Sequence, residues 1–270
     1  MEIIGYLASI LIGVSLGLIG GGGSILTVPV LVYLFGIHPV MATAYSLFIV
    51  GSTSFVGAIP KFKKGFVHLK TALIFGTPAL VTVYATRKFL IPLIPDRIFT
   101  VGAQVITKPV LLMVIFALLM LVASFSMIRG RQVENSLPDH NQNPTYNYKL
   151  IVLEGVIVGI LTGLVGAGGG FLIIPALVLF SKLSMKTAIG TSLVIIAAKS
   201  LIGFTGDLSH YMMDWSFLLI VTGLAIIGIF IGNWLNNKVP GKKLEKAFGW
   251  FVLVMGIGIL IKELFLDSFQ

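Results

Sequence analysis

Long runs without a charged residue alternate along this chain with short basic stretches. From Ile3 to Pro60 there is no Asp, Glu, Lys or Arg, and further uncharged runs lie at 71–86, 109–128, 155–181, 215–237 and 247–261. A helix needs roughly 20 residues to cross a hydrocarbon core of about 30 Å. Because a backbone in lipid must satisfy its own polar groups, runs of this kind form helices. The pattern therefore predicts an all-α polytopic membrane protein.

Composition agrees with this prediction. The chain is 57% hydrophobic and 11% charged, whereas a soluble domain has about a quarter of its residues charged. The first run, at 3–20, lacks the basic start of a signal peptide, so we expect a retained span. The chain has a net charge of +9. An excess of Lys and Arg is expected in the cytoplasmic loops of a membrane protein, so no nucleic-acid partner is predicted. There is no cysteine, which excludes thiol and disulfide chemistry.

The chain repeats itself. Residues 13–47 align without gaps on residues 159–193 at an offset of 146, and 13 of the 35 pairs are identical. Between the copies lies a polar stretch rich in Asn and Pro, at 129–149. We therefore expect a first transmembrane repeat at 1–128, a cytoplasmic linker at 129–149 and a second transmembrane repeat at 150–270.

Each repeat contains five hydrophobic segments. Those of the first lie at about 3–20, 25–36, 39–60, 71–86 and 109–128, and those of the second at about 150–166, 171–181, 185–204, 215–235 and 247–266. An odd number of crossings inverts the second repeat relative to the first. Two of the segments, 25–36 and 171–181, are short for a full crossing, so they either cross fully or form re-entrant half helices.

The distribution of basic residues tests this topology. With the N-terminus outside, the cytoplasmic loops contain thirteen Lys and Arg residues and the external loops five. This excess agrees with the positive-inside rule and predicts that both termini are external. The exception is the loop at 87–108, which should be external and yet contains Arg87, Lys88, Arg97 and Lys108.

Two glycine clusters interrupt the predicted helices at matching positions, Gly20–Ser24 and Gly166–Gly170. Each glycine costs a helix about 1 kcal/mol relative to alanine, so a cluster ends the helix. Paired interruptions in two repeats point to the substrate site of a transporter. A helix that restarts there presents free N–H groups and its positive dipole end, which favours an anion. The residues predicted to bind it are Gly21, Gly22, Gly23, Ser24, Gly168, Gly169 and Gly170.

Other glycines have a different explanation. Gly13 and Gly17, like Gly159 and Gly163, are four residues apart, which is typical of closely packed membrane helices. The cluster at 166–170 also has the appearance of a dinucleotide fingerprint. No strand–turn–helix unit surrounds it, so that interpretation is rejected.

Polar residues inside the segments are further candidates for the substrate site. Lys199 lies within an uncharged segment, where it either provides a counter-charge for the anion or extends its ammonium group towards the membrane surface. Ser46 and Thr53 lie seven residues apart, as do Ser192 and Lys199, so each pair shares a helix face. These hydroxyls either contact substrate or cross-link helices.

The remaining ionisable residues predict no catalytic chemistry. Asp207 and His210 are expected in a solvated loop, with a gating role as the alternative. The four histidines lack metal-ligand spacing, and there is no nucleophile–base pair or ATP-binding loop. We therefore expect no metal, no cofactor and no enzymatic activity. Transport would use a substrate gradient, the membrane potential, or a coupling ion such as a proton or sodium.

The glycine motif resembles that of a known family. The run Gly17-Leu-Ile-Gly-Gly-Gly-Gly-Ser-Ile-Leu-Thr-Val-Pro29, the following Ala42–Leu47 and their second copy are similar to the sulfite exporter TauE/SafE family, also called toluene sulfonate uptake permeases. The resemblance implies a multi-pass permease of the bacterial inner membrane for sulfite, sulfonate, sulfoacetate or related organic anions.

The resulting hypothesis is a secondary transporter of small anions that works by alternating access. The alternative within transport is a channel-like or cation-coupled permease for another solute. A membrane-embedded enzyme is less favoured, because Lys199 is the one ionisable residue placed firmly inside a segment. An assembly scaffold is also less favoured, because it would not need two glycine breaks.

Overall fold

The structure is a computed structural model, and it describes residues 2–21, 23–101, 104–129, 148–179, 181, 183–236 and 241–266. Most of the predicted linker, residues 130–147, and the predicted site residue Gly22 therefore lie outside the described part. Every segment predicted to be helical contains a helix.

The described residues of the first half of the chain form six α-helices and a hairpin. They are α1 (Glu2–Ile19), α2 (Ser24–Pro29) with a π-helical turn (Val30–Leu34), α3 (Pro39–Lys63), α4 (Leu69–Ala85) continued by a π-helical turn (Thr86–Leu90) and α5 (Ile91–Leu93), strands β1 (Arg97–Val101) and β2 (Gln104–Thr107), and α6 (Lys108–Arg129). The second half contains α7 (Tyr148–Val165), α8 (Gly170–Leu179), α9 (Met185–Asp207), α10 (Trp215–Asn236) and α11 (Gly241–Ile261), which ends in a π-helical turn (Lys262–Leu266).

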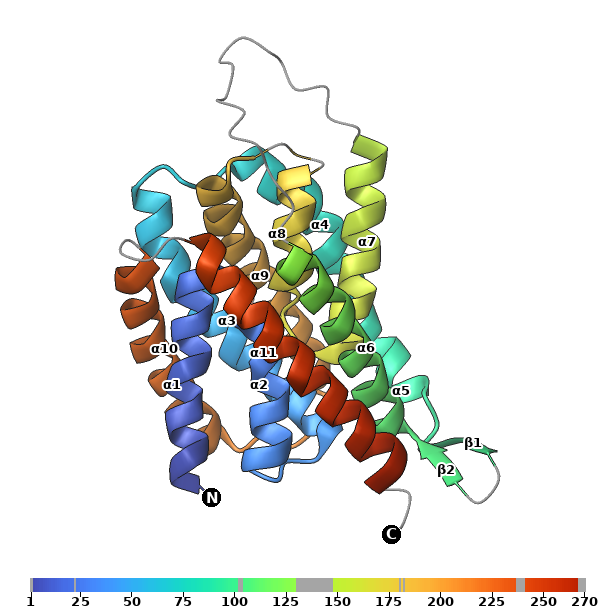
Figure 1. The fold of residues 1–270 in the computed structure, drawn as a ribbon. Coiled ribbons are helices and arrows are strands. Elements are labelled where there is room, and N and C mark those ends of the chain that lie inside the picture. The colour runs from blue at the N-terminus through green and yellow to red at the C-terminus, as the bar shows by residue number, and fades with distance from the viewer. Residues whose placement is uncertain are drawn as a thin grey trace.

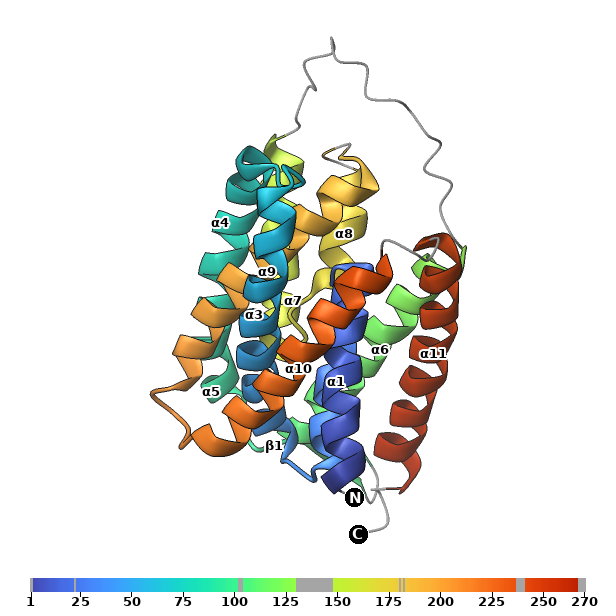
Figure 2. The same cartoon turned by 90° about the vertical axis from the view of Figure 1, so that its left-hand side faces the viewer.

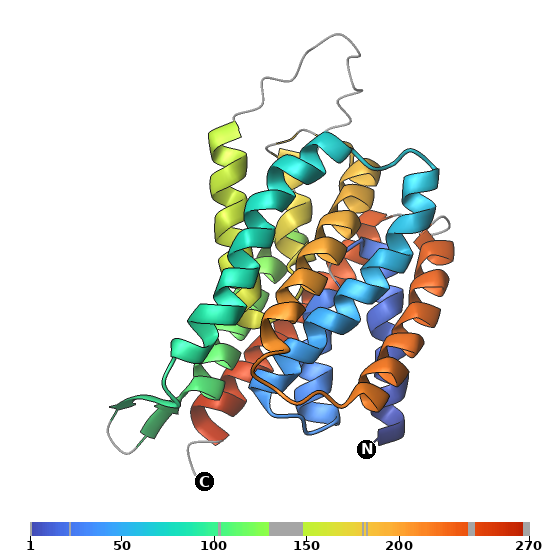
Figure 3. The same ribbon diagram turned by 180° about the vertical axis from the view of Figure 1, so that it is seen from behind.

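The helices form one bundle whose two ends are clearly distinguished (Figure 1). The start of α1, the end of α11 and the β-hairpin lie at one end, which we call the hairpin end (Figure 1). Helix α1 runs from the hairpin end to the opposite end of the bundle. Helix α7 runs from the opposite end towards the hairpin end, so the two helices have opposite directions (Figure 1). Helix α1 packs along α10, and α6 along α11 (Figure 2). Viewed from behind, α4 lies along α7, and α9 lies beside α3 (Figure 3).

Five of the described helical segments are long and apolar enough to cross a membrane. They are Pro39–Lys63, Leu69–Leu93, Lys108–Arg129, Met185–Asp207 and Trp215–Leu235. The first and fourth of these, α3 and α9, are the most buried. Apolar side chains cover the outside of the bundle, among them Leu11, Leu73 and Phe125, each more than 60% exposed. Such a surface suits lipid rather than water, and the protein is a multi-pass membrane protein.

Two shorter helices fill only part of the height of the bundle. Helix α8 has 10 residues, and α2 with its π-helical turn spans Ser24–Leu34. At 1.5 Å per residue each is about 15 Å long, roughly half of a hydrocarbon core. Of the two arrangements that the sequence left open, half helices match these lengths. Helix α2 lies in the half nearer the hairpin end and α8 in the other half (Figure 1).

Contacts between the halves recur with the halves exchanged. Gly13 on α1 packs against the backbone of Ala225 on α10, and Gly159 on α7 packs against the backbone of Ala79 on α4. Adding 146 to the number of each first-half residue and subtracting 146 from that of each second-half residue converts one contact into the other. The same exchange relates Gly20–Ile189 to Gly166–Thr43 and Gly57–Ile229 to Gly203–Val83.

The hairpin departs from the all-α prediction. No strand is predicted near 98–108, and the structure forms an antiparallel pair there, with Arg97 opposite Thr107 and Val101 opposite Gln104. Ile98, Val101, Val105 and Ile106 give the segment the β-branched composition typical of strands. The hairpin follows α5 and leads directly into α6.

Candidate substrate site

The two glycine loops, which join α1 to α2 and α7 to α8, meet inside the bundle. A Cβ atom placed on Gly21 would lie 2.6 Å from the Cα atom of Gly170, a separation that real side chains do not show. A Cβ atom on Gly168 would lie 3.3 Å from that of Ser24. Glycine is therefore what allows the two backbones to touch, and we call this place the glycine junction.

Backbone conformation adds a second reason for glycine. Gly20, Gly166, Gly168 and Gly169 have φ angles of 74°, 71°, 62° and 69°, in the left-handed region that only glycine adopts readily. Gly23 has an ordinary φ of −64°, but it packs against the backbone of Leu16 on α1. The glycine run thus turns the chain sharply and lets the loop return along the helix that precedes it.

Lys199 reaches the glycine junction from α9. Its side chain is fully buried, and its Nζ donates a 2.9 Å hydrogen bond to Oγ1 of Thr162 on α7. A Cβ atom on Gly169 would lie 2.8 Å from Nζ, so the ammonium group rests on the second glycine loop. Of the two alternatives for Lys199, extension towards the membrane surface is therefore wrong for this structure.

The predicted hydroxyls differ in their partners. Ser192 donates to the carbonyl oxygens of Gly20 and Ile189, each at 2.9 Å, so it connects α9 to the first glycine loop. Ser46 and Thr53 on α3 are fully buried, and neither hydroxyl has a hydrogen-bond partner among the described residues. Both lie about one helical turn from Val50, which contacts Gly168. Their helix face therefore adjoins the glycine junction.

An ion pair near the hairpin end corrects two sequence predictions. Arg87 was assigned to an external loop and Asp207 to a solvated one, but their side chains are 0% and 1% exposed. The Nε atom of Arg87 lies 3.6 Å from Oδ2 of Asp207, and its Nη1 donates a 3.0 Å hydrogen bond to Oγ1 of Thr43. Helix α9 runs on to Asp207, beyond its predicted end, and the helical segment that starts with α4 includes Arg87.

The charge pattern of the sequence contains a partial signal for this ion pair. Arg87 is one of the four basic residues that violate the positive-inside pattern. Buried charges are usually paired, so a buried arginine is expected to have an acidic partner. The partner, Asp207, lies 120 residues away in the sequence, and nothing local to either residue connects them.

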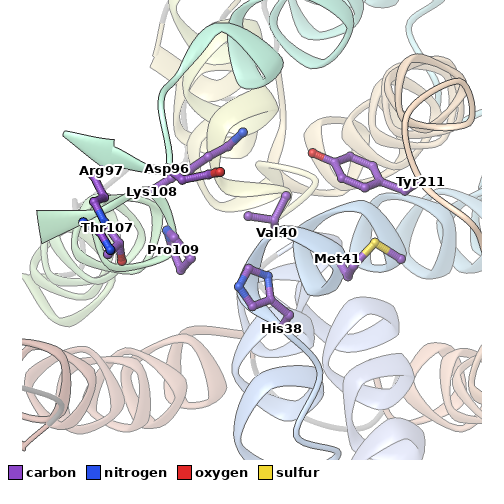
Figure 4. Close-up of a pocket in the computed structure, with 9 residues that line it drawn as sticks. All are labelled: His38, Val40, Met41, Asp96, Arg97, Thr107, Lys108, Pro109 and Tyr211. Carbon is purple, nitrogen blue, oxygen red and sulfur yellow. The ribbon is translucent and has the colours of Figure 1, made fainter. Parts of the chain in front are cut away.

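A pocket of about 510 Å³ opens at the hairpin end (Figure 4). Its lining residues are His38, Val40, Met41, Asp96, Arg97, Thr107, Lys108, Pro109 and Tyr211. Tyr211 points towards it from one side, and Asp96 and Lys108 lie on the other side (Figure 4). Burial and the Asp207 carboxylate raise the pKa of Tyr211, so the phenol stays protonated and can donate a hydrogen bond. Within the described ranges, no three His, Asp or Glu residues are placed to hold a metal ion.

Comparison with known proteins gives a consistent result. The profile of the family "Sulfite exporter TauE/SafE" matches residues 5–259. A probable membrane transporter protein of Xylella fastidiosa (strain 9a5c) is 28% identical over 253 residues, which cover 93% of this chain and 91% of that protein. The probable membrane transporter protein YdhB of Bacillus subtilis is 26% identical over 254 residues, covering 94% of this chain and 98% of YdhB. No solved structure was found to match the chain.

Proposed function

Because the chain belongs to the sulfite exporter TauE/SafE family and is a membrane transporter, we propose that it moves small sulfur-containing or organic anions by alternating access. Sulfite, sulfonates and sulfoacetate represent this substrate class. The membrane would be the inner membrane of a bacterium, and the transporter would work without a cofactor or catalytic step.

The observation that carries the proposal is the position of Lys199 at the glycine junction. Helix α8 begins at Gly170 and α2 at Ser24, so the N-terminal ends of two helices lie close to one buried ammonium group. Helix N-termini and a desolvated cation both favour an oxyanion. Glycine lets such an anion approach the backbone closely, and the unpartnered hydroxyls of Ser46 and Thr53 offer further donors.

The exchanged contacts support an inverted repeat. Helices α1 and α7 have opposite directions (Figure 1), and their packing glycines contact matching residues of α10 and α4. In transporters built this way the substrate lies between the repeats, and one repeat or bundle rocks against the other around it. On this basis the glycine junction would be exposed first to one side of the membrane and then to the other. A proton or sodium ion is the expected coupling ion.

Purified protein in proteoliposomes tests the proposal. Uptake of sulfite, methanesulfonate, sulfoacetate and acetate would be measured with and without the same anion inside the vesicles. Alternating access predicts saturable uptake that internal substrate accelerates, because the loaded carrier returns faster than the empty one. Non-saturable flux without such acceleration would indicate a channel, and failure to move any of these anions would contradict the proposed substrate class.

A further inference from the structure

One residue, Thr43, links the pocket at the hairpin end to Arg87 through hydrogen bonds. Val40 lines the pocket, and its carbonyl accepts a 2.7 Å hydrogen bond from Oγ1 of Thr43. The same Thr43 oxygen accepts the hydrogen bond from Arg87. On the other wall, the backbone N–H of Tyr211 donates to the carbonyl of Asp207 at 3.1 Å. The buried ion pair is therefore linked to the pocket lining through Thr43 on one side and Tyr211 on the other.

Arg87 is incompletely satisfied where it lies. Its guanidinium group has five N–H donors, but Nε and Nη2 make no hydrogen bond within the described part of the chain. Neither carboxylate oxygen of Asp207 accepts one there either. A buried ion pair is stable only when good geometry and additional hydrogen bonds offset the loss of hydration. At 3.6 Å this pair leaves donors available for a third group with negatively charged oxygens.

The positions that correspond to Arg87 and Asp207 in the other halves of the chain show that the fold does not require this ion pair. Adding or subtracting 146 residues converts Arg87 to Asn233 and Asp207 to Lys61. No acidic residue stands at either of these positions, and both polar atoms of the Asn233 amide lack a hydrogen-bond partner among described residues. The ion pair thus occurs at the hairpin end alone of these two places. The distribution of basic residues predicts that this end is external.

Thr43 connects the Arg87–Asp207 ion pair to the glycine junction. A methyl group on Gly166 would collide with the backbone of Thr43, so the second glycine loop is packed against the residue to which Arg87 is bonded. Arg97 and Lys108 add positive charge at the pocket wall, and Lys199 provides it at the junction. Basic side chains thus occur at the pocket wall, where Asp96 also lies, at the buried ion pair and at the glycine junction.

We propose that Arg87 is a second anion subsite, at which a small oxyanion from the pocket competes with Asp207 for the guanidinium group. The subsite depends on the proposed function for its ligand class, and it would hold the anion at the external mouth, one step from the glycine junction. A sulfite or sulfonate group offers two oxygens to the Nε and Nη2 donors, which suits the fork geometry of arginine. While no anion is bound, Asp207 keeps the guanidinium group neutralised.

The test measures binding at equilibrium, independently of transport. Isothermal titration with sulfite and with methanesulfonate would use the detergent-solubilised full chain carrying Lys199→Met, so that the central site is silenced. We expect residual binding that Asp207→Asn tightens by roughly tenfold, because the competing charge is removed. The double change Arg87→Gln with Asp207→Asn should abolish it. Lys61→Gln, which alters the counterpart position at the other end, is the matched control and should leave it unchanged.

Three results would overturn the subsite: no residual binding in the Lys199→Met protein, residual binding that survives the double change, or an affinity that Asp207→Asn does not alter. Should the double variant fail to elute as a folded protein on size exclusion, Asp207→Asn decides alone, since it keeps Arg87 intact. Loss of the subsite would leave the proposed function standing if wild-type proteoliposomes still take up these anions. If they transport none, the proposed function fails instead.

Discussion

Lys199 on α9 is hydrogen-bonded to Thr162 on α7, with 2.9 Å between the ammonium nitrogen and the hydroxyl oxygen. No carboxylate forms an ion pair with this lysine in the part of the chain that the structure describes. A lysine at the centre of a membrane helix costs about 2.5–3.5 kcal/mol, and such residues tend to face a substrate path. One neutral hydroxyl compensates only part of this cost. On the proposed function, the remaining N–H donors of Lys199 would bind the anion.

Replacing Lys199 by Met should therefore weaken anion transport without unfolding the protein. Removing the charge takes away the main electrostatic attraction for the anion, so we expect the half-saturating concentration for uptake to rise about tenfold or more. The melting temperature should stay the same or rise, because a buried charge is replaced by an apolar side chain of similar length. Proteoliposome uptake and thermal unfolding in detergent measure the two effects.

Thr162→Val is the matched control for that experiment. It removes the neutral partner and keeps the charge, so the affinity should change much less than in Lys199→Met. The half-saturating concentration of the Lys199→Met protein would also be measured across a salt series. If it equals that of the wild-type protein at every salt concentration, the lysine has no contact with the anion.

The orientation in the membrane can be tested with single cysteines, because the chain contains none. A cysteine at the exposed Ser209, between α9 and α10, should react with a membrane-impermeant reagent in intact spheroplasts. A cysteine at Lys64, at the opposite end of the bundle, should react only after the membrane is opened. The reversed labelling pattern would place the hairpin end in the cytoplasm.

The helices were predictable because their signal is local. Uncharged runs give the segments to within a few residues for most helices, for example 109–128 predicted against Lys108–Arg129 observed. Glycine clusters mark the loops for a similar reason, because consecutive glycines destabilise a helix wherever they occur. The 146-residue offset of the sequence repeat also relates contacts in the structure, because it converts the contact of Gly13 into that of Gly159.

Partners distant in the sequence were not predictable in this way. Arg87 and Asp207 each look like a residue at the end of a hydrophobic run, and a charge there is normally solvated. Their burial results from how α4 and α9 pack, which composition does not encode. Likewise, the hydroxyls of Ser46 and Ser192 occupy matching positions in the repeats. Only the structure shows that Ser192 has hydrogen-bond partners, whereas Ser46 has none among the residues it describes.

The packing glycines should respond to substitution differently from the loop glycines. Gly13→Ala and Gly159→Ala each place a methyl group against backbone of a neighbouring helix, so we expect them to lower stability by about 1–3 kcal/mol. Gly168→Ala adds strain of roughly 1–2 kcal/mol at a left-handed φ and also narrows the glycine junction. Melting temperature and uptake would be measured for all three variants.

Plotting uptake against melting temperature separates the two roles. Gly13→Ala and Gly159→Ala should lose uptake in proportion to their loss of stability. Gly168→Ala should fall below that line, because it also obstructs the approach of the anion to the backbone. If all three variants fall on one line, the loop glycines serve packing alone, and the face of α9 that carries Ser192 and Lys199 becomes the first place to look for the site.

Ser46 and Ser192 allow substrate contact to be distinguished from helix cross-linking, because only one of them has partners in the structure. Ser192→Ala removes the hydrogen bond to Gly20, and the loss should cost about 1 kcal/mol and lower the melting temperature by a few degrees. Ser46→Ala removes a buried hydroxyl that bonds to no described residue, so stability should stay the same or rise. If the Ser46 hydroxyl donates to the anion, the half-saturating concentration for uptake should increase about fivefold to tenfold in Ser46→Ala. Thr222→Val is the control, because Thr222 on α10 is also buried without a described partner and none of the junction contacts involves it. An unchanged affinity in Ser46→Ala together with a lower melting temperature would assign the α3 hydroxyls to helix packing and leave Lys199 and the loop backbones as the anion's partners.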